Sequence, residues 1–301
     1  MHARLYNEMM EHLWILLALV SAFSLATSDA LTKKALAFHN EYLIAWLRLV
    51  LTLPVLFIAF IFVPVPPLDA AFFRAFAAAL PLEIASVILY IKALKLSPLS
   101  LTLPFLSLTP VFLIVLPRIV LGEEVSALGG FGILCIAAGG YLLNIRDIKK
   151  GILEPVYAIG RERGVVCMII VAVIYSFTST LGKMAIGHSS ALFFAVTYFT
   201  ALVIAFTPVA LYKGRSELRS IIGSGAVTAS VLPGLFYAAM IISHMIAMSL
   251  TQVAYMISVK RLSLIFGVIY GYVLFRESGI RERLAGTALM IAGFALIILF
   301  H

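Results

Sequence analysis

Residues 121–140 read LGEEVSALGGFGILCIAAGG, and residues 275–294 read FRESGIRERLAGTALMIAGF. With an offset of 154, the two stretches match at one acid and two glycines: Glu123 on Glu277, Gly132 on Gly286, and Gly139 on Gly293. A second match, at an offset of 150, places LTKKAL at 31–36 over LGKMAI at 181–186. The sequence therefore predicts that a hydrophobic unit has been duplicated within the chain.

The composition excludes a soluble globular domain. Hydrophobic residues make up 63% of the chain and charged residues 12%, and the mean hydropathy is +1.10, which leaves too little polar surface to face water. A helix needs about 20 apolar residues to cross the hydrocarbon core of a bilayer. This criterion predicts ten spans, at roughly 13–31, 42–63, 75–94, 99–121, 126–145, 165–185, 190–212, 226–249, 252–275 and 283–300.

Ten spans divide into five for each copy of the duplicated unit. Because five is odd, the second copy must enter the membrane in the opposite orientation to the first. The predicted fold is thus an all-α polytopic membrane protein with ten transmembrane helices in two inverted five-helix repeats. We predict a first repeat at 1–145, a basic linker loop at 146–164 and a second repeat at 165–301, with no separate soluble domain.

The basic residues predict the orientation of the chain. Of the 22 Lys and Arg residues, fifteen lie at the odd-numbered loops, either within a loop or at the adjoining end of a predicted span. Cytoplasmic loops collect Lys and Arg. We therefore expect the odd-numbered loops in the cytoplasm and both termini on the opposite side.

Several short motifs recur along the spans. They are ALKLSP at 93–98, LTPVF at 108–112, LGE at 121–123, VKRLS at 259–263, FRE at 275–277, the paired glycines at 132, 139, 286 and 293, and Arg48 within LRL. In their order and double occurrence these motifs resemble the EamA-type repeat of the drug/metabolite transporter superfamily. The resemblance implies a ten-helix carrier with the third, fourth, eighth and ninth helices around a central cavity and the fifth and tenth outside. Leu264 stands where the first copy has Pro110, so the sequence does not predict a matching helix break in the ninth span.

Ionisable residues inside the spans are the strongest pointers to function, because each costs roughly 2.5–3.5 kcal/mol at a helix centre on insertion scales. Glu83 and Tyr90 are seven residues apart, so both project from one face of the third span. At an offset of 154 they fall on Tyr237 and His244, which form the same stripe in the eighth span. We interpret the stripes as substrate-binding cavity walls, with Glu83 and His244 as candidate coupling groups. The alternative is interhelical packing with satisfied hydrogen bonds.

Lys260 and Arg261 are neighbours deep in the ninth span, about 100° apart on the helix. Such a pair suits an anionic substrate, and it resembles the Lys-Arg pair that contacts substrate phosphate in the plastid organophosphate translocators of the same superfamily. A structural ion pair, with Glu83 as one partner, and snorkelling to the interface are the alternatives. For Arg48 too, substrate contact and a structural ion pair are both possible interpretations, and the ion pair is favoured.

Other polar residues rank lower. Ser28 and Thr178 are second-rank cavity candidates, because hydroxyls in membrane helices usually bond to their own backbone. Asp29 and Lys183 lie near span ends and can reach the interface. Glu123 and its counterpart Glu277 close the fourth and ninth spans, where capping the next helix or pairing across a loop is the expected role.

The sequence contains no enzyme signature: no phosphate-binding Gly-rich loop with Lys, no His-Glu-x-x-His, no paired Cys motif and no Gly-x-Ser-x-Gly. We predict a protein that is not an enzyme and that uses no cofactor or metal. The expected function is secondary-active transport, in the export direction, of a small polar metabolite that can be anionic, by alternating access. A lipid or lipid-headgroup flippase is the alternative.

The expected partners are a small-molecule substrate and membrane lipid, with no nucleic acid, because the basic residues are spread over loops. Proton coupling, uniport and exchange all fit the sequence, as do a monomer and a homodimer. We expect a multi-pass protein of the plasma membrane, the inner membrane of the cell.

Overall fold

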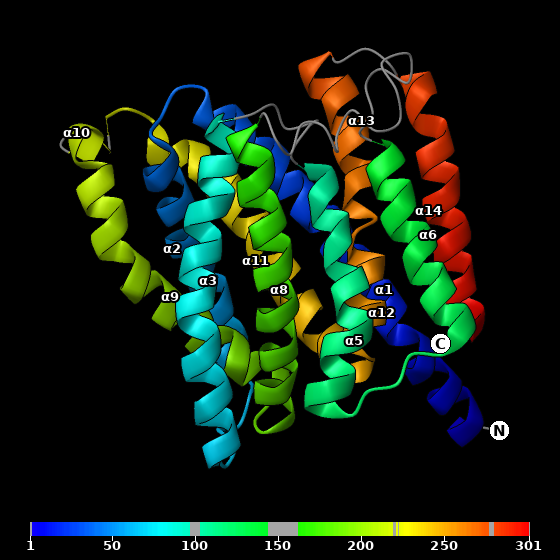
Figure 1. The fold of residues 1–301 in the computed structure, drawn as a ribbon. Coiled ribbons are helices and arrows are strands. Elements are labelled where there is room, and N and C mark those ends of the chain that lie inside the picture. The colour runs from blue at the N-terminus through cyan, green and yellow to red at the C-terminus, as the bar shows by residue number, and fades with distance from the viewer. Residues whose placement is uncertain are drawn as a thin grey trace. The chain divides into compact units, whose positions relative to one another are not determined.

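The structure is a computed structural model that describes residues 2–96, 103–143, 162–218, 221, 223–276 and 280–300 (Figure 1). All regular elements within these residues are helical. They are α1 (His2–Leu36), α2 (Glu41–Phe60), α3 (Ala70–Leu96), the 3₁₀ helix η1 (Leu103–Leu108), α5 (Thr109–Leu121), α6 (Ala127–Leu143), α8 (Arg163–Gly187), α9 (Ala191–Lys213), α10 (Arg215–Leu218), α11 (Ala226–Leu250), α12 (Val253–Lys260), α13 (Ser263–Phe275) and α14 (Ile280–Phe300).

The predicted transmembrane helices are confirmed. Eight stretches of helix are long and apolar enough to cross a membrane: 12–36, 41–60, 70–93, 163–187, 191–213, 226–250, 253–275 and 283–300. Two shorter apolar stretches, 105–121 and 127–143, supply the fourth and fifth spans. The chain is a multi-pass membrane protein, and the part of it that the structure describes is all-helical. Most of the predicted linker at 146–164 lies outside the described residues.

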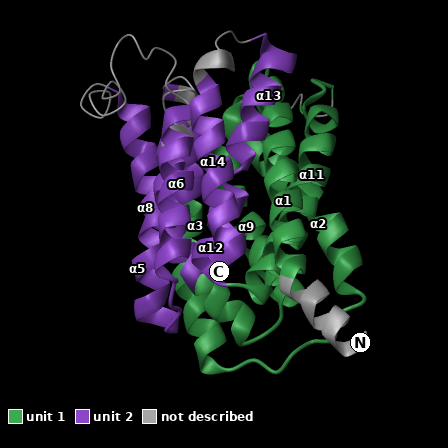
Figure 2. Cartoon of the chain, turned by 90° about the vertical axis from the view of Figure 1, so that its right-hand side faces the viewer, with its two compact units in different colours: residues 1–84, 181–251 green, residues 85–180, 252–301 purple. Residues whose placement is uncertain are grey.

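The chain forms two compact units (Figure 2). Unit 1 consists of residues 1–84 and 181–251, and unit 2 of residues 85–180 and 252–301. Each unit therefore takes helices from both halves of the sequence. The unit boundaries fall inside α3 and α8 and at the junction of α11 with α12.

Unit 1 contains the second helix of each copy, α2 and α9, packed side by side. Trp46 Nε1 donates to Thr207 Oγ1 at 2.9 Å, and further along the pair the ring centroids of Phe60 and Phe193 are 5.9 Å apart. Because an early residue of α2 meets a late residue of α9, and the reverse, the two equivalent helices run antiparallel. This is the relation that inverted repeats require.

Unit 2 repeats this relation with the fifth helix of each copy, α6 and α14. A Cβ added to Gly132 would lie 2.7 Å from Gly293 O, and a Cβ added to Gly139 would lie 2.7 Å from Gly286 O. The two glycine-bearing helices thus approach each other closely, and the crossed pairing again makes them antiparallel. Only a residue without a side chain fits at such a contact.

The fourth and ninth spans are both irregular, and the break in the ninth was not predicted. In the first copy the 3₁₀ helix η1 leads into α5, and in the second a turn at Arg261 and Leu262 separates α12 from α13. No proline is needed for the second break, because the turn is closed by tight hydrogen bonds. Leu264 N donates to Arg261 O at 3.0 Å and Ile265 N donates to Leu262 O at 2.9 Å, one residue closer along the chain than α-helical bonding.

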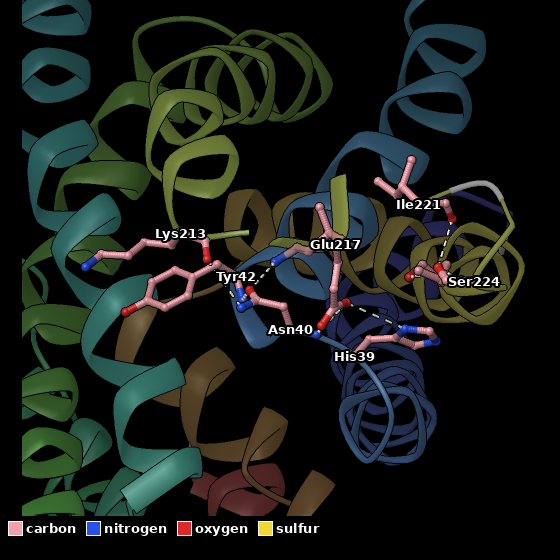
Figure 3. A network of polar contacts seen from close by, with 10 residues as sticks. His39, Asn40, Tyr42, Lys213, Glu217, Ile221 and Ser224 are labelled. Atoms are coloured by element: carbon pink, nitrogen blue, oxygen red, sulfur yellow. Dashed lines mark hydrogen bonds and ion pairs between the residues drawn. The ribbon is translucent and has the colours of Figure 1, made fainter. Parts of the chain in front are cut away.

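Polar contacts link the loops at both ends of the α2–α9 pair. At one end, shown in Figure 3, Glu217 Oε2 accepts from the backbone N–H of Asn40 at 3.0 Å and lies 3.8 Å from His39 Nδ1. At the other end His188 Nδ1 lies 2.7 Å from Asp69 Oδ2. The pKa of Asp69 lies below its usual value, because its carboxylate accepts a hydrogen bond from the backbone N–H of Phe72 and contacts His188.

Candidate functional site

Unit 1 carries four polar side chains within its spans, and three of them are in contact. Arg48 Nη1 donates to Asp29 Oδ1 at 2.9 Å, and the guanidinium carbon of Arg48 lies 4.4 Å from the centre of the Tyr237 ring. Glu83, on α3, belongs to the same unit and lies near the middle of its span. We call Asp29, Arg48, Glu83 and Tyr237 the unit 1 cluster. Its members lie on α1, α2, α3 and α11.

The unit 1 cluster lies at the depth where a charge is most costly in lipid. Arg48, Glu83 and Tyr237 are all near the middle of their spans, at 41–60, 70–93 and 226–250. The side chains of Arg48 and Asp29 are 15% and 37% exposed. A charge at this depth costs roughly 2.5–3.5 kcal/mol on insertion scales, and the ion pair with Asp29 offsets part of that cost for Arg48.

The sequence favoured an ion pair for Arg48 without indicating its partner. Pairing was favoured for Arg48, and Asp29 supplies it, although Asp29 itself was expected to reach the interface. Hydropathy places each residue on its own helix and does not show which helices are neighbours. An opposite charge in each of two consecutive spans was the signal that could have indicated this ion pair.

The other predicted residues of unit 1 are buried between helices. His244 lies on α11, two turns after Tyr237, and is 9% exposed. Ser28 is fully buried, and its hydroxyl donates to Pro233 O at 2.8 Å. Ser28 therefore fastens α1 to α11, at a position where a proline interrupts the backbone bonding of α11.

The stripe predicted on α3 is divided between the units. Glu83 belongs to unit 1 and Tyr90 to unit 2. Tyr90 is partly buried against a hydrophobic cluster that contains Phe105 and Met168. Thr178, on α8, also lies in unit 2 and is 8% exposed.

Unit 2 places Lys260 and Arg261 at the break in the ninth span. Lys260 is the last residue of α12 and is partly buried, and Arg261 in the following turn is 7% exposed. Arg261 Nη2 donates to Thr109 Oγ1 at 3.0 Å. Both cations are near the middle of the span at 253–275 rather than at the interface.

Helical segments follow one another directly in this part of unit 2. The helix α5 begins at Thr109, straight after η1, and α13 begins at Ser263, straight after the turn whose carbonyls accept from the N–H groups of Leu264 and Ile265. Among the described residues of unit 2 the acidic ones lie in loops or in the first turn of a helix: Glu123, Glu124, Glu162 and Glu282.

Two further charged side chains have structural roles. Glu123 Oε2 accepts from the backbone N–H of Val253 at 2.8 Å, so it caps α12, a helix of the other copy, where capping of the next helix was one expectation. Lys183 Nζ donates to Met248 O and, at 2.9 Å, to Thr251 O, which satisfies carbonyls at the end of α11. Glu277 lies outside the described residues.

Comparisons with known proteins agree with this architecture. The model of the EamA-like transporter family matches residues 12–145 and 162–299. No curated protein matches the chain. A protein of known crystal structure is similar in fold, with a TM-score of 0.70 and 16% sequence identity, over 95% of this chain and 96% of that chain.

Proposed function

The chain belongs to the EamA-like transporter family, and we propose from this that it is a secondary-active carrier that exports a small polar metabolite by alternating access. The family is one of membrane transporters of the drug/metabolite type, and its model matches both copies of the duplicated unit. The match gives no support to the alternative of a lipid flippase. We place the protein in the plasma membrane, with the odd-numbered loops in the cytoplasm.

The substrate that fits best carries an anionic group. The observation that supports this is the position of Lys260 and Arg261 at the break in the ninth span, where Arg261 contacts the first residue of α5. Two adjacent cations near the middle of one span favour a carboxylate or a phosphate, because Lys and Arg form charge-assisted hydrogen bonds with such anions and ionisable residues within spans commonly serve a ligand. Broken helices near the midplane serve this purpose in other secondary transporters.

Unit 1 contains titratable groups that could couple substrate transport to proton movement. Glu83, near the middle of its span, is a candidate proton acceptor, and His244 is a second titratable group on the helix that carries Tyr237. A carrier of this kind moves one bundle of helices against another around the substrate. The carboxylate would then exchange its proton as access changes.

Uptake into reconstituted vesicles tests the anion site. Lys260→Ala and Arg261→Ala should each lower the uptake of an anionic substrate by about tenfold or more, because charge-assisted hydrogen bonds are lost. Arg118→Ala is the matched control, since Arg118 lies in the same unit, is 69% exposed and pairs with Glu124 at the end of α5. Unchanged uptake in both variants would contradict the anion site.

The pH dependence of uptake tests the coupling role separately. Glu83→Gln should make uptake independent of pH in the range where the unmodified protein responds, because the amide cannot exchange a proton. Glu124→Gln, at a side chain that is 76% exposed, should leave the pH profile as it is. A full pH response in Glu83→Gln would remove Glu83 from the coupling step.

A further inference from the structure

We infer that Thr109 is a positioning residue of the anion site, whose hydroxyl holds the Arg261 guanidinium in place at the break in the ninth span. The inference rests on the proposed function, because it takes Arg261 as a contact of the substrate anion. It assigns a role to the threonine of the LTPVF motif at 108–112, which the proposed function leaves without one.

The contact joins the two irregular spans of unit 2. Thr109 Oγ1 accepts from Arg261 Nη2 at 3.0 Å, Thr109 is fully buried and Arg261 is 7% exposed. Thr109 is the first residue of α5, and Arg261 lies in the turn between α12 and α13. A long side chain in a turn has many conformations, so a buried hydrogen bond to its tip restricts where the charge can lie.

Thr109 differs in its hydrogen bond from Thr52 and Thr180, two other buried threonines of the spans. Thr32, in contrast, likewise accepts from an arginine, Arg48 Nη1, at 3.5 Å. Thr52 and Thr180 each donate to the carbonyl four residues earlier, at 2.8 Å, as hydroxyls in membrane helices commonly do. The residue four before Thr109 is Phe105, which lies in the 3₁₀ helix η1 rather than in an α-helix. Within the described part of the chain, the bond from Arg261 is the hydrogen bond that the Thr109 side chain makes.

The residues at the equivalent positions of the two copies form different hydrogen bonds. At an offset of 154, Ser107 falls on Arg261 and Thr109 falls on Ser263. Ser107 Oγ donates to Ala137 O at 3.1 Å, within its own copy, whereas Arg261 donates across to the other copy. One copy thus supplies the cation and the other supplies the oxygen that orients it.

A guanidinium held in one orientation binds an anion more tightly than one that must first be ordered, because the ordering is already complete before binding. Loss of the Thr109 hydroxyl should therefore weaken the binding of anions and leave the movements of the carrier alone. Thr109→Val removes the oxygen at nearly constant shape, and Thr109→Ser keeps it. Thr180→Val is the matched control, since Thr180 is in unit 2, is 1% exposed and bonds within its own helix.

The test measures initial rates of uptake of glycerol 3-phosphate and malate into vesicles that contain the full chain, with a thermal-shift assay of the same two anions. Thr109→Val should raise the KM of the transported anion about tenfold, with a maximal rate within about twofold of the unmodified protein. Thr109→Ser should restore the KM, and Thr180→Val should not change it.

Arg261→Lys separates the two proposals. If Arg261→Lys raises the KM and Thr109→Val does not, the positioning role is wrong and the proposed anion site stands. If neither variant changes the KM, or the unmodified protein neither transports nor binds either anion, the anion site is wrong and the role of Thr109 falls with it. Equal losses in Thr109→Val and Thr109→Ser, or a loss that follows melting temperature, would assign Thr109 a purely structural role.

Discussion

Each unit contains an antiparallel pair of equivalent helices, α2 with α9 in unit 1 and α6 with α14 in unit 2, but the two pairs are held by different chemistry. The pair in unit 1 is joined by aromatic rings and by hydrogen bonds such as that of Trp46, and the pair in unit 2 by glycines whose backbones touch. The duplication set the same antiparallel relation in both. The side chains decide whether a pair becomes a tight seam or leaves room for polar groups.

The aromatic side of unit 1 continues as far as the unit 1 cluster. Tyr198 stacks on Phe194 with ring centroids 4.9 Å apart and meets Phe76 edge-on at 5.4 Å. Phe199 in turn lies 6.2 Å from Tyr237. These contacts hold the Tyr237 ring in place against the Arg48 guanidinium. The glycine contacts of unit 2 provide no such support for a side chain.

The largest effect, on thermal stability, is expected where the glycines of α6 and α14 touch in unit 2. Gly139→Ala should lower the thermal stability of the purified protein by roughly 1–3 kcal/mol, because its Cβ would lie 2.7 Å from Gly286 O and 2.8 Å from Met290 N. Gly267→Ala, on α13 with nothing within 4 Å of the added Cβ, is the control and should be neutral or stabilising. Equal melting temperatures for the two variants would show that the seam is not tightly packed.

A smaller effect is expected in the unit 1 cluster, and on transport more than on folding. Arg48→Ala should reduce uptake about tenfold, since Asp29 loses its ion pair and Tyr237 its stacked cation. Arg48→Lys should recover part of the rate, because lysine keeps the charge but not the planar stacking. If Arg48→Ala transports as fast as the unmodified protein, the ion pair of Arg48 with Asp29 serves only helix packing.

The sequence predicted the helices well and their neighbours poorly. Spans follow from local hydropathy, and the duplication from a fixed offset, so both could be predicted from the chain alone. The pairing of Asp29 with Arg48 depends on which helices meet, and the break at Arg261 depends on hydrogen bonds in a turn without proline. The Thr109 contact was missed for the same reason, since it joins residues 152 positions apart.

The smallest effect is expected outside the membrane spans, at Asp69. Its pKa is lower in the folded protein than its ordinary value of 3.8, so its contribution to stability is present above that value and is lost as the pH falls below it. Asp69→Asn should flatten the fall in melting temperature below about pH 4 and change little at pH 7. An unchanged acid profile would show that the contacts to Phe72 and His188 do not stabilise the fold.

The inverted duplication can be tested by labelling two equivalent loops. His39 and Ser189 correspond at an offset of 150 and lie after the first and sixth spans. His39→Cys and Ser189→Cys would each be made in a chain with Cys135 and Cys167 replaced by alanine, and treated with a membrane-impermeant maleimide on intact and on opened cells. We expect labelling from opposite sides of the membrane, with position 39 reached only after opening. Labelling of both positions from the same side would contradict the inverted repeats and the carrier built from them.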